Sequence, residues 1–203
     1  MNEKHPGEGR YSFPYFFAPS LIFFVALSLC FLPPPATAQK AERDRLSQFD
    51  RLAEEATLLN QREQFEKVIT LLEPYKADKK NDSALFFNEL GVAYRKAGRF
   101  SEAIKAYQFA LSRDPENPVV MKNLGDVFYL KKEYSRAVEL YQKALRPNPR
   151  FQQAHYSLGL AYYQLQKYQE ALGEFEIVLK LDPKDEQARK FREAALKKMK
   201  SQN

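Results

Sequence analysis

The sequence has no tryptophan, one cysteine, two histidines and seven glycines among its 203 residues. The cysteine, Cys30, lies in an apolar N-terminal stretch, so the chain from residue 39 onward can form neither a disulfide bond nor a cysteine-based metal site. Glycine-rich phosphate loops, Cys-x-x-Cys, His-Glu-x-x-His and nucleophile-elbow motifs do not occur. We therefore predict no catalytic residues, no metal site and no cofactor, and we expect that the protein is not an enzyme.

Long runs of one charge are also missing. The net charge is +6, from 32 basic and 26 acidic residues, and these are spread along the chain. Nucleic-acid-binding tails typically carry runs of about five or more like charges. The content of 29% charged and 44% hydrophobic residues is that of a globular protein. We therefore expect solvated helix faces and no nucleic-acid partner.

Residues 1–38 differ from the rest of the chain. A polar start leads into an apolar run, Leu21 to Leu32, which is followed by three prolines and an Ala-Thr-Ala tripeptide that ends at Ala38. This order is typical of a secretory signal peptide, and it predicts a protein exported to the periplasm or cell envelope. Two alternatives stay open. The first is an uncleaved membrane anchor over residues 15–32, which is close to the length of about 20 residues that a spanning helix needs. The second is lipid attachment at Cys30.

Three units between Ala84 and Pro183 share one pattern at a spacing of 34 residues. Leu90 and Gly91, followed by an aromatic residue at Tyr94, recur as a Leu-Gly pair and an aromatic residue in the two later units. Each unit also carries a downstream set of small and aromatic residues and closes on a proline. The matched downstream sets are Ala103, Tyr107 and Ala110; Ala137, Tyr141 and Ala144; and Ala171, Phe175 and Val178.

This pattern resembles the tetratricopeptide repeat (TPR), a 34-residue helix–turn–helix unit. Phe87, Met121 and His155 occupy the bulky position at which the family usually has tryptophan, and we expect His155 to be a packed, structural histidine. The resemblance implies an all-α fold, an α-solenoid of antiparallel helix pairs. Its three good repeats are expected at residues 84–117, 118–151 and 152–185.

Helical periodicity continues on both sides of the three repeats. Residues 39–82 predict a degenerate N-terminal repeat, with one helix from Lys40 to about Asn60 and a second from Phe65 to Glu73. Pro74 is expected to end the second helix, and a polar connector follows. Residues 186–203 predict a C-terminal cap helix.

The glycine at the same place in each repeat predicts close helix packing. Glycine costs about 1 kcal/mol relative to alanine inside a helix, so its recurrence at Gly91, Gly125 and Gly159 indicates that the second helix of each pair approaches closely. We expect the aromatic residue of that second helix, Tyr107 in the first good repeat, to fill the gap between repeats.

The resemblance also implies a concave groove, lined by the first helix of each repeat, that binds a segment or helix of another protein. This interpretation favours a non-enzymatic scaffold or adaptor; the alternative is a self-associating component of an envelope complex. The tyrosines carry the most weight because tyrosine is enriched where interfaces hold binding energy. The expected partner-contacting residues are Asn88, Arg95, Lys122, Asn123, Asp126, Tyr129, Tyr156, Leu160 and Tyr163.

Some members of the family hold the C-terminal carboxylates of chaperones with lysine, arginine and asparagine in this groove. Of the matching positions in this sequence, only Asn123 carries the expected residue type. The others are Asn88, Val92, Gln153 and Ser157. Capture of a C-terminal dicarboxylate is therefore not expected, and the groove is better suited to a mixed polar and apolar segment.

Overall fold

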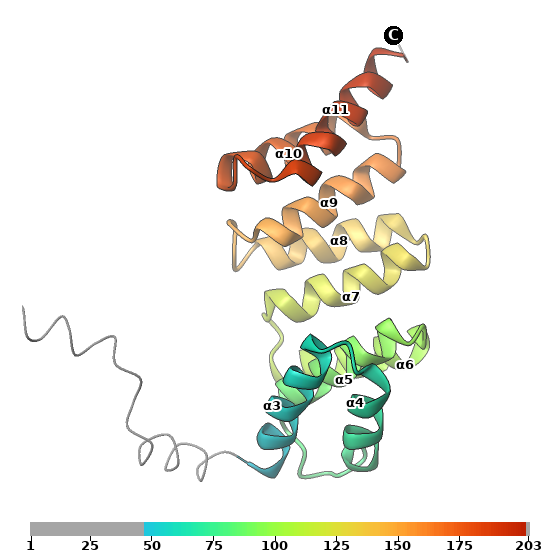
Figure 1. Cartoon of the computed structure of the whole chain (residues 1–203), viewed down its shortest axis with the longest axis vertical. Coiled ribbons are helices and arrows are strands. Elements are labelled where there is room, and N and C mark those ends of the chain that lie inside the picture. Colours follow the sequence, from blue (N-terminus) through green and yellow to red (C-terminus); the bar gives the residue numbers. More distant parts are fainter. Residues whose placement is uncertain (1–46, 202–203) are drawn as a thin grey trace, which may run out of the picture. The chain divides into compact units, whose positions relative to one another are not determined.

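The computed structural model describes residues 47–201, and every regular element in that range is a helix (Figure 1). The predicted all-α fold is confirmed. The elements are α3 (Gln48–Gln61), α4 (Phe65–Leu72), the 3-10 turn η2 (Glu73–Tyr75), α5 (Ala84–Lys96), α6 (Phe100–Arg113), α7 (Pro118–Leu130), α8 (Tyr134–Leu145), α9 (Gln152–Gln164), α10 (Tyr168–Leu181) and α11 (Glu186–Lys200).

Several predictions concern residues outside the described range. These are the signal peptide at residues 1–38, the alternative anchor at 15–32, lipid attachment at Cys30, and residues 40–46 of the first predicted helix. Within residues 47–201, no helix is both long enough and apolar enough to cross a membrane.

The predicted repeats correspond to the helix pairs α5–α6, α7–α8 and α9–α10. The two helices of each pair pack along each other, and each pair packs against the next in chain order (Figure 1). At the two ends of this series, α3 and α4 pack against α5, and α11 packs against α10. The described residues therefore form the α-solenoid that the repeat pattern predicts.

Polar side chains fix the starts of several helices. Ser83 caps α5, where its Oγ accepts a hydrogen bond from the Phe86 amide at 3.2 Å. Asn117 caps α7, where its Oδ1 accepts from the amides of Val119 and Val120, both at 3.1 Å. Such caps satisfy amide groups that have no partner inside the helix, which is why these two helices begin where they do.

The turn inside each helix pair places one residue in the left-handed region at the same point. Gly98, Lys132 and Gln166 have φ angles of 75°, 63° and 60° in the three good repeats. Glu63, with φ of 58°, does the same between α3 and α4. Because residues other than glycine rarely adopt this conformation, the shared turn indicates that α3 and α4 form a unit of the same kind, as the degenerate repeat predicts.

The repeated glycines lie directly under the aromatic rings of their own repeats. A Cβ atom at Gly91 would lie 2.7 Å from Cε1 of Tyr107, and one at Gly125 would lie 2.6 Å from Cε1 of Tyr141. The predicted close approach of the two helices is therefore confirmed. The expectation that Tyr107 fills the gap between repeats is wrong, because its ring lies against Gly91 of the same repeat, where the missing side chain leaves room.

The connector after η2 is more buried than its polar sequence suggests. Asn81 and Ser83 are 1% and 6% exposed. The Asn81 side chain accepts a hydrogen bond from the Ser83 amide at 3.3 Å and donates one to the Tyr75 carbonyl at 3.4 Å. The connector is thus held against the solenoid by its own polar side chains.

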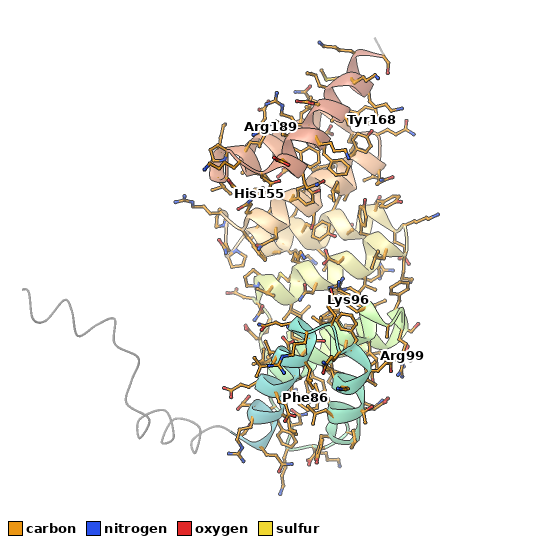
Figure 2. The ribbon with its side chains drawn as sticks, viewed as in Figure 1. Phe86, Lys96, Arg99, His155, Tyr168 and Arg189 are labelled. Atoms are coloured by element: carbon orange, nitrogen blue, oxygen red, sulfur yellow. The ribbon has the colours of Figure 1, made fainter. Side chains whose placement is uncertain are left out.

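His155 is buried between α9 and α10 (Figure 2), as a structural histidine should be. Its Nε2 lies 3.0 Å from the Pro149 carbonyl oxygen, and its Nδ1 lies 2.7 Å from Oε2 of Glu174. The ring therefore joins the loop before α9 to the second helix of the same repeat.

Candidate partner-binding groove

The first helices of the repeats, α5, α7 and α9, expose large apolar side chains at groove positions. Leu85, Val119 and Leu130 are 42%, 47% and 49% exposed. Hydrogen bonds join these helices in order, from Asn123 on α7 to Asn88 on α5 and from Gln164 on α9 to Tyr129 on α7. The face is therefore continuous across the three repeats and offers apolar surface to a partner.

Two of the predicted contact residues form part of a buried polar ladder. Asn123 donates to Oδ1 of Asn88 at 3.1 Å, and Asn88 donates to Oε1 of Glu89 at 3.0 Å. Asn60 of α3 donates to Oε2 of the same Glu89 at 2.8 Å. Asn88 and Asn123 are only 7% and 9% exposed. Their amides are therefore occupied in joining α3, α5 and α7, and little of either side chain faces solvent.

A hollow of about 430 Å³ lies where α7, α9 and the start of α11 meet. Lys122, Asp126 and Tyr156, all predicted contact residues, line it. Lys122 and Asp126 form an ion pair of 2.9 Å and are about one-fifth exposed. The hollow therefore offers a partner an aromatic ring beside a paired charge.

A second hollow of about 150 Å³ adjoins the first, because Asp126 and Ser157 line both. Four of its lining residues, Arg95, Asp126, Tyr129 and Leu160, were also predicted as contacts. The hydroxyl of Tyr141 donates to Oδ1 of Asp126 at 3.0 Å. Burial, together with the Asp126 charge, raises the pKa of Tyr141, so this hydroxyl keeps its proton and holds Asp126 in place.

Arg95 brings uncompensated polarity to the second hollow. Its Nε and the hydroxyl of Tyr107 are buried, and neither has a hydrogen-bond partner among the described residues. Burial raises the pKa of Tyr107, and the nearby Arg95 charge opposes this shift. A buried donor without a partner costs about 1–3 kcal/mol, so an acceptor supplied by a bound segment would be favoured here.

The predicted tyrosines differ in how freely they face the groove. Tyr129 packs edge-on to Tyr134 at 5.3 Å between ring centroids. Tyr156 and Tyr163 both pack against Phe191 of α11, at 6.1 and 6.3 Å. The last two rings therefore also fasten the cap helix to the third repeat, a use that the repeat pattern did not predict.

The structure adds residues that were not among the predicted contacts. Gln153, Ser157, Asp185 and Gln187 also line the larger hollow. Gln187 lies 34 residues after Gln153, so continuing the repeat register into the cap helix would have found it. Gln152 donates to Oδ2 of Asp185 at 3.2 Å, which fixes the start of α11 against α9.

The described residues contain no group of three or more histidine, cysteine, aspartate or glutamate side chains arranged to hold a metal ion. The ionisable groups of the groove lie instead in the Lys122–Asp126 pair, in Arg95 and in the tyrosines. This arrangement can bind polar and apolar groups of another molecule.

Comparison with known proteins bears on what this groove does. A family model described as tetratricopeptide repeat matches residues 88–150 and 133–186. Comparison with the curated proteins gave no match. The first TPR domain of human RPAP3 is 30% identical, with a TM-score of 0.57 over 58% of this chain and 93% of that one.

Two further solved structures have the same fold. The first TPR of Spaghetti (RPAP3), bound to an HSP90 peptide, is 30% identical, with a TM-score of 0.56 over 57% of this chain and 92% of that one. A MamA structure is 23% identical, with a TM-score of 0.64 over 76% of this chain and 88% of that one, and shows the fold alone. TPR proteins are generally protein-interaction modules rather than enzymes. From the repeat pattern, the helix pairs and these matches, the chain belongs to the tetratricopeptide repeat family.

Proposed function

We propose that this protein is a non-enzymatic adaptor of the cell envelope that holds a segment of another protein in the groove on α5, α7 and α9. The observation that carries the proposal is the pair of adjoining hollows between α7 and α9, bordered by the half-exposed Leu130. Apolar anchors surrounded by satisfied polar groups are the usual anatomy of a protein-binding surface.

The residues of the groove indicate the chemistry of the bound segment. Leu130 and Tyr129 favour an apolar side chain, whereas Arg95 and the Tyr107 hydroxyl favour a hydrogen-bond acceptor beside it. The related RPAP3 domain binds an HSP90 peptide. A chaperone tail is not the partner proposed for this chain, because Asn123, the one matching residue, already bonds to Asn88.

The envelope setting rests on the sequence of residues 1–38, which has the order of a secretory signal peptide. Cleavage after Ala38 would leave Gln39 as the first residue. N-terminal sequencing of the protein from its host, after fractionation of the cells, tests this part. An uncleaved or lipidated N-terminus would replace it with a membrane-attached protein, and a cytoplasmic protein would refute it.

The groove is tested by a photo-crosslinking residue at Gln153, which is exposed and lines the larger hollow, with a control at the exposed Lys143 of α8. A partner captured only from Gln153, and lost in Leu130→Lys, supports the proposal. Leu58→Lys is the matched control, since Leu58 is 55% exposed at the N-terminal end of the solenoid. Crosslinks to a second copy would favour self-association, and equal capture from both positions would refute the groove.

A further inference from the structure

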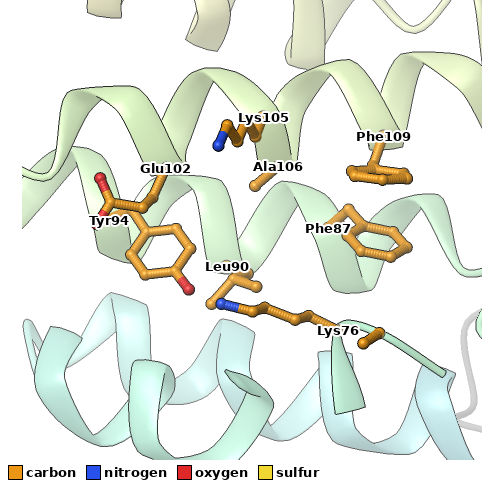
Figure 3. Close-up of a pocket in the computed structure, with 9 residues that line it drawn as sticks. Lys76, Phe87, Leu90, Tyr94, Glu102, Lys105, Ala106 and Phe109 are labelled. Atoms are coloured by element: carbon orange, nitrogen blue, oxygen red, sulfur yellow. The ribbon is translucent and has the colours of Figure 1, made fainter. Parts of the chain in front are cut away.

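A separate hollow of about 350 Å³ lies between the end of α4 and the α5–α6 pair (Figure 3). Its floor is apolar: Phe87, Leu90 and Ala106 are at most 5% exposed. Lys76 and Lys105 stand at its edge (Figure 3). None of the predicted groove residues lines it, so whatever binds here would bind independently of the groove.

The hollow follows from the early end of α4. This helix has 8 residues, whereas α6, α8 and α10, which hold the same place in their repeats, have 14, 12 and 14. Pro74 has no amide hydrogen for the Thr70 carbonyl and disfavours continuation of the helix. The chain turns away through η2, and the surface of α5 and α6 that the missing turns would cover is left open.

Phe109 of α6 forms the exposed wall of this hollow. Its ring stacks on Phe87 at 5.2 Å between centroids, with an interplanar angle of 21°, and yet it is 51% exposed. A smaller hollow of about 270 Å³ lies on the outer face of α6, and Phe109 and Lys105 line both. The next repeat has Lys143 at the position of Phe109, so the fold itself does not require an aromatic residue there.

The charges at the edge are not balanced. Glu102 is paired with Arg99 at 3.0 Å, and Lys76 with Glu73 at 2.8 Å. Lys105 forms no ion pair with any residue between 47 and 201. A ligand that places an apolar group on Phe87 and Phe109 therefore finds a free cation next to it.

We propose that this hollow is a second docking site, which takes a bulky apolar side chain of a partner protein segment with a carboxylate next to it in sequence. The apolar floor binds the side chain, and Lys105 pairs with the carboxylate. With two sites of different chemistry, one chain could hold two partner segments at once. This inference goes beyond the proposed groove and does not depend on it.

The test uses the full chain and a capped hexapeptide, Gly-Glu-Glu-Leu-Phe-Gly, titrated while backbone amide chemical shifts are followed. Saturable shifts are expected at Leu90, Lys105 and Phe109. Replacing the peptide phenylalanine by alanine should weaken binding at least about tenfold, because a buried phenylalanine contributes about 1.5–3 kcal/mol. Replacing both glutamates by glutamine should weaken it about two- to fivefold, the range for an exposed ion pair.

Two variants borrow residues that the next repeat already carries at the same positions, so the helix should tolerate them. Phe109→Lys should abolish binding, and Lys105→Glu should remove the advantage of the glutamate peptide over the glutamine peptide. Leu130→Lys in the groove should change neither result. The proposal is overturned if the peptide shifts only groove residues, if it binds Phe109→Lys equally well, or if it does not bind. It is also overturned if Phe109→Lys dissociates a dimer, because a second copy would then cover the hollow.

Discussion

Replacing Gly125 by alanine tests the packing on which every repeat depends. The added Cβ would lie 2.6 Å from Cε1 and 2.9 Å from Cδ1 of Tyr141. This ring is 1% exposed, and its hydroxyl is bonded to Asp126, so it has no free space to move into. We therefore expect Gly125→Ala to push α8 away from α7 and to destabilise the protein.

Two opposing contributions set the magnitude. Alanine is favoured over glycine inside a helix by about 1 kcal/mol. Overpacking a filled site typically costs about 1–3 kcal/mol. The net change in the free energy of unfolding should therefore be a loss of up to about 2 kcal/mol.

Gly173→Ala is the matched control, because Gly173 lies inside α10 and nothing is within 4 Å of the Cβ that alanine would add. This variant should gain up to about 1 kcal/mol. Since both variants receive the same helix-propensity gain, the difference between them isolates the packing cost, about 1–3 kcal/mol.

Urea unfolding followed by circular dichroism measures both variants, and an unchanged m-value shows that the cooperative unit is the same. For a domain of this size, each kcal/mol also shifts the melting temperature by about 2–4 °C. If Gly125→Ala proved as stable as Gly173→Ala, the close approach of α7 and α8 would be refuted. A destabilised Gly125→Ala that unfolds in the same way should also bind its groove partner less well, because Tyr141 positions Asp126.

The two buried tyrosines give two further predictions. Tyr141→Phe should cost about 1 kcal/mol because it removes the bond to Asp126, whereas Tyr107→Phe should be nearly neutral, since that hydroxyl has no partner; equal losses in urea unfolding would contradict this. Burial raises the pKa of both side chains. Below about pH 10 both the folded and the unfolded protein keep these protons, but above it only the unfolded tyrosines ionise. The free energy of unfolding should therefore fall as pH rises above about 10, by up to about 1.4 kcal/mol per pH unit for each tyrosine. The double Tyr→Phe variant should show a shallower fall, and an unchanged slope would show that other groups cause it.

Much of the fold could be predicted because each repeat must bury the same contacts. Recurrence of Leu90 and Gly91 at a fixed spacing predicted the helix pairs, and Asn117 before Pro118 predicted the start of α7. The left-handed residues Glu63, Lys132 and Gln166 could not be found this way, because their residue types give no signal for that conformation. The turn is imposed by the packing of the helices on either side of it.

The groove was predictable in position and less so in detail. Arg95, Lys122, Asp126 and Tyr156 line its hollows, as residues on the exposed face of the first helices should. The burial of Asn88 and Asn123 depends on how closely α5 and α7 approach, which a single sequence does not reveal. Pro74 did predict the end of α4, but the hollow beside it appears only when α6 is in place.

Positions at which the repeats differ are more informative about function than those at which they agree. In the second repeat, the Tyr141 hydroxyl has Asp126 as its acceptor; in the third, Phe175 has no hydroxyl and Leu160 stands in place of Asp126. Both arrangements are internally satisfied. The first repeat has the hydroxyl of Tyr107 but Val92 where the acceptor would be, and Arg95 lies nearby with its Nε unpaired. A repeat selected for stability alone would have adopted one of the two satisfied arrangements, so the unsatisfied donors are best explained by a bound partner that completes them.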